Sequence, residues 1–172
     1  MTARSAFEAI FAAHYDAVTR FAMRRVPQEA VHDVVSETFL TAWRRFDDLR
    51  GEPLPWLLGI ARRVSANQLR GGERRAALVE RLGAQVAGSG AGPDEVDGEL
   101  LHALARLSER DREALILVAW DGLTNRQAAE VVGCSATAFG VRLHRARGRL
   151  KRELERRGQG SVDLSNEASV LR

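Results

Sequence analysis

Residues 123–154 read LTNRQAAEVVGCSATAFGVRLHRARGRLKREL and predict a short helix, a tight break at Gly133 and a longer, very basic helix. Thr124 and Gln127 have the spacing of a capping box, and Ser135 is placed to cap the second helix. Two capped helices around a short turn with Gly are typical of a helix-turn-helix, whose second helix enters the DNA major groove. The alternative is an ordinary helical hairpin with a solvated basic face. The excess of arginine on the second helix favours DNA binding.

The second helix of this stretch has two faces at helical spacing. One face is apolar and is predicted to pack in a core; it consists of Ala136, Phe139, Leu143, Ala146, Leu150 and Leu154. The opposite face is predicted to contact DNA; it consists of Thr137, Ala138, Val141, Arg142, Arg145 and Arg149. The first three of these lie near the helix start, where a recognition helix touches bases, and the arginines are expected beside phosphates.

Two short helices are predicted before this motif, in a domain that starts near Glu99. The first is lined by leucines, namely Leu100, Leu101, Leu104 and Leu107. Ser108 is expected to cap the second, which ends at Asp121-Gly122 because glycine adopts the terminating conformation. Upstream, residues 87–98 (AGSGAGPDEVDG) are typical of a flexible acidic linker and mark a domain boundary.

The N-terminal part of the chain predicts two amphipathic helices, at residues 5–26 and 28–48. The apolar stripe of the first consists of Phe7, Ile10, Phe11, Tyr15, Val18, Phe21 and Ala22, and that of the second of Val31, Val34, Val35, Phe39, Ala42, Trp43 and Phe46. On the second helix, Asp33, Glu37 and Thr41 share one side at four-residue steps. This acidic strip is either a solvated face or a docking site for a basic partner helix, and the spacing favours neither.

A third helix is predicted from Trp56 to Arg70, after a loop with Gly and Pro breakers, and Gly71-Gly72 is expected to end it. A polar arc on it consists of Arg62, Arg63, Ala66, Asn67 and Arg70. Arginine and asparagine are suited to phosphates and base edges. Trp56 lies at the margin of the arc, where an aromatic ring stacks on an unpaired base. Core packing is the favoured alternative for this tryptophan.

Composition excludes several other classes of protein. The 172 residues carry a formal net charge of +3 and a single cysteine, Cys134, so neither an intrachain disulfide nor a cysteine-based metal site is expected. The four histidines have no ligand-like spacing, and the longest apolar run, Ala114 to Trp120, is too short to cross a bilayer. We expect a cytoplasmic protein without a signal sequence, a cofactor or a metal. Cys134 is interpreted as a small buried residue at the turn rather than a redox sensor.

Two stretches together resemble a known family. Residues 33–51 (DVVSETFLTAWRRFDDLRG) with residues 56–70 (WLLGIARRVSANQLR) are similar to region two of bacterial RNA polymerase sigma factors, and residues 107–154 resemble their region four. With only these two regions and a short linker, the chain resembles the extracytoplasmic-function (ECF) class over residues 5–156. The resemblance implies a protein without catalytic chemistry of its own that directs promoter-specific initiation by RNA polymerase.

The same resemblance assigns expected roles to the candidate surfaces. It implies that the strip of Asp33, Glu37 and Thr41 docks on the clamp helices of the polymerase β′ subunit, with the β subunit as a further contact. The third helix is implied to melt and recognise the −10 element by capturing a flipped base, through Trp56, Arg62, Arg63, Asn67 and Arg70. The face from Thr137 to Arg149 is implied to recognise the −35 element. An anti-sigma factor is the further partner expected.

The sequence also departs from the family pattern at base-reading positions. Arg63 stands at the usual asparagine position and Asn67 at the usual aspartate. Ala138, Gly140 and Val141 replace the common Thr, Lys and Ser. We therefore expect ordinary phosphate anchoring and unusual base preference at both elements. Gly140 also weakens its helix by about 1 kcal/mol relative to alanine.

We therefore predict an all-α protein of two small helical domains joined by a flexible linker, the second containing the helix-turn-helix. The predicted divisions are region two at 1–72, the linker at 73–98, region four at 99–157 and a disordered tail at 158–172. Two alternatives remain at this point. One is a free-standing helix-turn-helix regulator that binds duplex DNA alone. The other is an interaction protein whose acidic strip binds a different helical partner.

Overall fold

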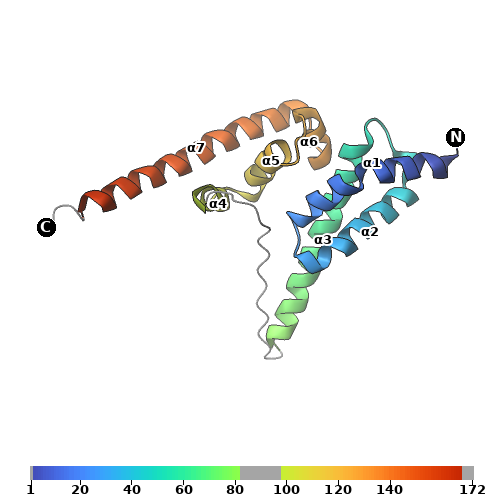
Figure 1. The fold of residues 1–172 in the computed structure, drawn as a ribbon, viewed down its shortest axis with the longest axis horizontal. Helices are drawn as coiled ribbons and strands as arrows, with labels where there is room; N and C mark the ends of the chain where they lie inside the picture. The colour runs from blue at the N-terminus through green and yellow to red at the C-terminus, as the bar shows by residue number, and fades with distance from the viewer. Residues whose placement is uncertain (1, 82–97, 168–172) are drawn as a thin grey trace. The chain divides into compact units, whose positions relative to one another are not determined.

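The structure is a computed structural model that describes residues 2–81 and 98–167, with side chains described for 2–71 and 98–156. All secondary structure in these ranges is helical, and the chain divides into two compact units. The N-terminal unit contains α1 to α3, and α4, α5 and α7 belong to the C-terminal unit (Figure 1). The prediction of an all-α protein with two helical domains is confirmed. Most of the predicted linker, residues 82–97, lies outside the described residues.

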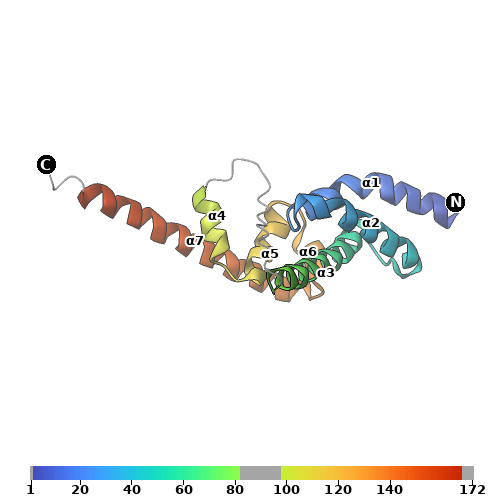
Figure 2. The ribbon, with the colours of Figure 1, turned by 90° about the horizontal axis from the view of Figure 1, so that it is seen from below.

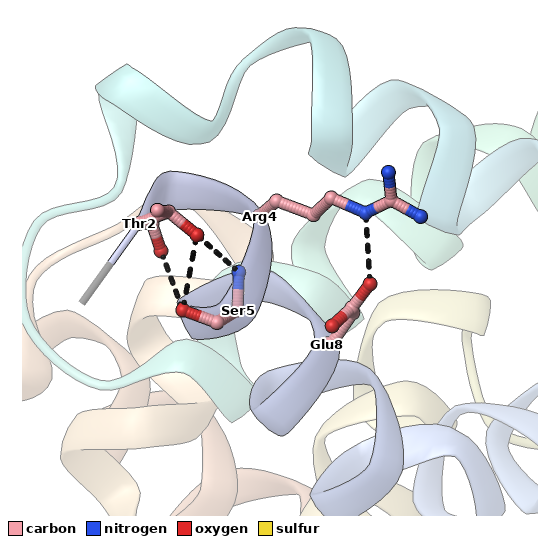
Figure 3. A network of polar contacts seen from close by, with 4 residues as sticks. All are labelled: Thr2, Arg4, Ser5 and Glu8. Atoms are coloured by element: carbon pink, nitrogen blue, oxygen red, sulfur yellow. Dashed lines mark hydrogen bonds and ion pairs between the residues drawn. The ribbon is translucent and has the colours of Figure 1, made fainter.

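The N-terminal unit consists of α1 (Ala3–Met23), α2 (Gln28–Arg44) and α3 (Pro53–Arg81), each packed against the other two. A short 3-10 helix, η1 (Phe46–Asp48), follows α2. Thr2 caps α1, because its Oγ1 accepts the N–H of Ser5 at 3.2 Å, and Arg4 pairs with Glu8 at 3.0 Å on the adjoining turn (Figure 3). Polar chemistry thus fixes the first turn of α1, where the side chains are exposed.

The core of this unit lies toward the C-terminal half of α1. It is formed by Val18, Phe21, Ala22, Val34, Val35, Phe39, Ala42, Leu57, Leu58, Ile60 and Ala61, all at most 5% exposed. The stripes predicted for the first two helices are therefore confirmed only in part, because Phe11, Tyr15 and Trp43 are 39–46% exposed. These rings contact other rings instead: Phe11 lies 4.6 Å from Phe39 and Phe7 lies 5.1 Å from Trp43, between ring centroids.

Both predicted ends of the third helix were wrong. The helix α3 begins at Pro53 rather than Trp56, because proline is tolerated in the first turn, where the amide has no helical partner. At the other end, Gly71-Gly72 does not stop α3, which continues to Arg81. A helical glycine costs about 1 kcal/mol but does not forbid the conformation. The left-handed backbone occurs before the helix, at Gly51 (φ 81°).

The C-terminal unit is built around one long helix. Its elements are α4 (Gly98–Ala105), α5 (Glu109–Ala119) and α7 (Ala136–Glu167), and α6 (Asn125–Val132) groups with it up to Ala129. Both α4 and α5 pack against α7 (Figure 2). The prediction that Ser108 caps α5 is confirmed, because its Oγ accepts the N–H of Asp111 at 3.2 Å. The helix ends before Gly122, which takes a φ of 67° as predicted.

The helix-turn-helix is formed by α6 and α7, and its predicted caps are confirmed. The Gln127 N–H donates to Thr124 Oγ1 at 3.3 Å, and the Thr124 N–H donates back to Gln127 Oε1 at 3.0 Å. This reciprocal pair is a capping box. Ser135 Oγ accepts the N–H of Ala138 at 3.1 Å and so caps α7. Between the helices Gly133 adopts a left-handed φ of 74°.

The apolar face of α7 agrees with the prediction except at its first residue. Phe139, Leu143 and Ala146 are at most 2% exposed, and Leu150 and Leu154 are half-buried. Ala136 is exposed because it begins the helix, ahead of the turn that packs on the core. The tail prediction was also wrong up to Glu167, since α7 is helical to that residue and no proline interrupts it. Residues 168–172 lie outside the described residues.

Candidate functional site

A groove of about 600 Å³ lies between α2 and α3 in the N-terminal unit. Its α2 wall contains Asp33, Glu37 and Thr41, and its α3 wall contains Arg63 and Asn67. Apolar residues of both helices also line the groove, among them Val34, Leu40, Ile60 and Val64. The sequence predicts these two polar sets on separate helices. The structure places them along the same groove, so a partner bound to one wall lies close to the other.

The α2 wall is acidic and open to solvent. The side chain of Asp33 is 75% exposed, and the Thr41 hydroxyl donates to Glu37 Oε1 at 3.3 Å. Leu40, which is 49% exposed, stands next to Thr41 on the same helix. An exposed leucine beside two carboxylates suits a partner helix that presents both basic and apolar side chains, because each carboxylate then meets a cation and the leucine loses contact with water.

The α3 wall is polar and basic. Arg70 Nη2 donates to Asn67 Oδ1 at 2.5 Å, so these two residues of the predicted −10 set are joined. Arg63 is exposed on the groove, whereas Arg62 is half-buried. Trp56 is also half-buried, in the first turns of α3 and away from the groove lining. The structure therefore gathers Arg63, Asn67 and Arg70 and leaves the tryptophan apart from them.

The predicted DNA-contacting face of α7 is exposed over its first three turns. Thr137, Ala138, Val141 and Arg145 are exposed, and Val141 keeps 47% of its surface. Arg142 is half-buried on the same face. Small apolar groups near the helix start, followed by guanidinium groups, match what thymine methyls and phosphates require.

Arg149 is placed differently from the rest of this set. Its Nη1 donates to Oδ2 of Asp111 on α5, and Asp111 is only 4% exposed. Helical spacing does not predict this pair, because the two residues are 38 positions apart. One signal was present: Asp111 falls at helical spacing with Leu107, Ala114 and Leu115, which are buried. A carboxylate on an apolar face needs a partner.

Two other classes of site receive no support from the described part of the chain. Within it, no three His, Cys, Asp or Glu side chains are grouped so as to hold a metal ion. None of the helices described there is long and apolar enough to cross a membrane. Cys134 is half-buried at the turn between α6 and α7, where its N–H donates to the carbonyl of Ala129 at 2.9 Å.

Comparison with protein families matches both units. Residues 10–75 match the model of sigma-70 region 2, and residues 97–150 match that of sigma-70 region 4. Among curated proteins, the chain is similar to the RNA polymerase sigma factor NccH of Alcaligenes xylosoxydans xylosoxydans, at 32% identity over 73% of each chain. It is also similar to the RNA polymerase sigma factor CarQ of Myxococcus xanthus, at 32% identity over 87% of this chain and 89% of that protein. The ECF RNA polymerase sigma-E factor of Salmonella typhi is 28% identical over 84% of each chain.

Solved structures give the same result. The sigma factor RpoE from Bartonella quintana, solved with the anti-sigma factor NepR, superposes with a TM-score of 0.65 at 27% identity. That match covers 87% of this chain and 96% of the other. CnrH, solved with the cytosolic domain of CnrY, gives a TM-score of 0.60 at 27% identity and covers 88% and 89% of the two chains.

Proposed function

Because this chain belongs to the ECF type of RNA polymerase sigma factors, which direct transcription initiation by RNA polymerase, we propose that three of its surfaces divide that work. In the groove between α2 and α3, the α2 wall binds core enzyme and the α3 wall binds the −10 element. The outward face of α7 serves the −35 element. The observation that carries the proposal is a single groove that has Asp33 and Glu37 on its α2 wall and Arg63 and Asn67 on its α3 wall. The family is not catalytic, so the chemistry of RNA synthesis belongs to the polymerase.

The acidic wall is the proposed core-binding surface. Asp33 and Glu37 attract a basic helix, and the proposed partner is the β′ clamp helices. Leu40 adds an apolar contact with the same partner. The Thr41 hydroxyl holds the Glu37 carboxylate by a 3.3 Å hydrogen bond and so limits its rotamers. Exposed ion pairs contribute little stability individually. Electrostatic complementarity here acts mainly on the rate and selectivity of docking.

The basic wall and its neighbours are the proposed −10 surface. Arg63 and Asn67 face the groove, and Arg70 fixes the orientation of the Asn67 amide through its Oδ1. With Oδ1 engaged, the Nδ2 group of Asn67 is the part left to donate to a base edge. Arg62 neutralises the charge of a phosphate. The ring of Trp56 packs against an unstacked base.

The start of α7 is the proposed −35 surface. Thr137, Ala138 and Val141 present methyl groups and one hydroxyl to base edges, and Arg142 and Arg145 neutralise phosphates. Since two of these positions are Ala138 and Val141, we propose that thymine methyl groups contribute more to recognition than hydrogen bonds do.

A protein partner and a compartment complete the proposal. The Bartonella quintana protein was solved with an anti-sigma factor, and CnrH with the cytosolic domain of CnrY. We propose an anti-sigma factor as the inhibitor of this chain as well. We place its activity in the cytoplasm, where RNA polymerase acts.

A charge reversal tests the assignment of the acidic wall. Glu37→Lys is expected to weaken binding of fluorescently labelled chain to core RNA polymerase by about tenfold or more, because like charges then face each other across the interface. The matched control is Asp16→Lys on α1, which reverses an exposed charge outside the groove. Equal affinities of the two variants for core enzyme would remove Glu37 from the interface.

The same pair of variants separates the proposal from a chain whose acidic strip binds some other helical protein. In that case Glu37→Lys leaves promoter-specific transcription with core enzyme at the wild-type level. The proposal requires a loss that follows the loss of core affinity.

A further inference from the structure

Asp111 is the one buried charged residue among the side chains that the structure describes. It stands in the first turn of α5, where its N–H donates to the Ser108 hydroxyl at 3.2 Å and to the Ser108 carbonyl at 3.0 Å. The backbone of this turn is therefore satisfied by the cap. The carboxylate, with the residue 4% exposed, needs a partner from within the protein.

Arg149 on α7 supplies that partner, through a hydrogen bond from Nη1 to Oδ2 of Asp111. The Asp111 side chain is 6% exposed and that of Arg149 is 51% exposed, so the pair is closed on the α5 side only. One turn further along α7, Glu153 pairs with Arg156 at 2.7 Å and with Arg106, just after α4, at 3.4 Å. These contacts tie the start of α5 and the end of α4 to one stretch of α7.

The apolar contacts of α7 with the core run through Phe139, Leu143 and Ala146. Hydrophobic contact is not directional, so it resists separation of the helices more than it resists a small rotation of α7 or a small shift along its axis. A charged hydrogen bond is directional, so it opposes that rotation and that shift. Thr137 lies twelve residues before Arg149, or about 18 Å along the same helix. A rotation of α7 about its axis at Arg149 therefore moves the side chains proposed to contact the bases.

We propose that Asp111 and Arg149 form a positioning pair that sets the rotation and axial position of the recognition helix, and that this pairing, not phosphate neutralisation, is the main role of Arg149. This inference rests on the proposed role of α7 at the −35 element. A phosphate that took over the whole Arg149 side chain would leave the Asp111 carboxylate unpaired inside the protein, which is strongly unfavourable. Base contacts need their groups held to about 0.5 Å, so a directional bond between α5 and α7 favours accurate reading.

The test uses holoenzyme assembled from core RNA polymerase and the full chain. It compares binding to two promoter fragments that share the −10 element and differ only in an intact or scrambled −35 element. Two quantities are measured. The first is the −35 ratio, which is the dissociation constant for the scrambled fragment divided by that for the intact fragment. The second is the slope of the logarithm of the binding constant against the logarithm of the salt concentration. The key variant is Asp111→Asn, which keeps the side-chain shape and a hydrogen-bond acceptor and so preserves the fold. Its matched control is Glu109→Gln, the same change at an exposed position of the same turn.

If the pair positions α7, the ratio falls about tenfold in Asp111→Asn, which is the effect of losing specific recognition of one base pair. The salt slope stays at its wild-type value, and Glu109→Gln changes neither quantity. Arg149→Ala lowers the ratio by a similar factor. Arg149→Lys, which retains the charge and one hydrogen bond, restores most of it.

Three results would overturn the inference. One is a wild-type ratio in Asp111→Asn, which would make the pair a matter of stability alone. Another is a salt slope lowered by about 0.9 in Arg149→Ala with the ratio unchanged, the signature of a lost phosphate contact. The third is a wild-type holoenzyme that does not distinguish the two fragments. That result would refute the proposed role of α7 as well, so the two failures are distinguishable.

Discussion

Gly140 and Gly148, which both lie inside α7, should each be replaceable by alanine with a gain in stability. A Cβ added at Gly148 meets nothing within 4 Å, and one added at Gly140 meets only the Asn125 amide nitrogen at 4.0 Å, an ordinary contact. With no steric penalty, only the helical preference remains, and it favours alanine by about 0.5–1 kcal/mol at each site. The sites are eight residues, or about 12 Å, apart, so the effects should add to about 1–2 kcal/mol.

The gain is measured by urea unfolding of the C-terminal unit. Replacing Trp43 and Trp56 by phenylalanine leaves Trp120, in the C-terminal unit, as the only tryptophan, and its fluorescence then follows this unit. The opposite control is Gly122→Ala. That glycine lies in the same unit and has a left-handed φ of 67°, so alanine there should destabilise the unit by about 1 kcal/mol or more. A loss of stability in Gly148→Ala, or no loss in Gly122→Ala, would show that backbone conformation does not control stability at these glycines.

Three further substitutions test other parts of the structure. Ser65→Ala should stabilise the N-terminal unit by about 1 kcal/mol, because the buried Ser65 hydroxyl has no hydrogen-bond partner among the described residues; urea unfolding checks it, and a destabilised variant contradicts it. Phe139→Ala should destabilise the C-terminal unit by about 3–5 kcal/mol, since the ring is completely buried; a loss below about 1 kcal/mol in the same assay would argue against the packing of α7. Arg145→Ala should weaken promoter binding equally with intact and scrambled −35 elements and lower the salt slope by about 0.9. A loss confined to the intact element would instead make Arg145 a base reader.

Local chemistry explains which features could be predicted from the sequence. The caps at Ser108, Thr124 and Ser135 were predicted because a cap depends on residues three positions apart. Gly122 and Gly133 were placed correctly at helix ends for the same reason. The exposed face of α7 followed from helical spacing, which fixes which side chains lie opposite the apolar stripe.

Features that depend on neighbouring helices could not be predicted in this way. Gly71 and Gly72 each carry a local penalty of about 1 kcal/mol, and α3 continues through both. Nothing in the spacing of Asp33 or Arg63 indicates that their helices form one groove. The pairing of Arg149 with Asp111 likewise needs the packing of α5 on α7, so periodicity alone assigned Arg149 to the DNA face.

The most direct test of the central claim is transcription in vitro. Start sites mapped after overexpression of the chain supply the promoter, and purified chain is then added to core RNA polymerase on that DNA. If the chain is a sigma factor, a transcript starts at the mapped site only when chain and core enzyme are both present, and it is lost when either promoter element is scrambled. A chain that binds its site tightly without core enzyme, yet never supports initiation, would instead be a free-standing regulator.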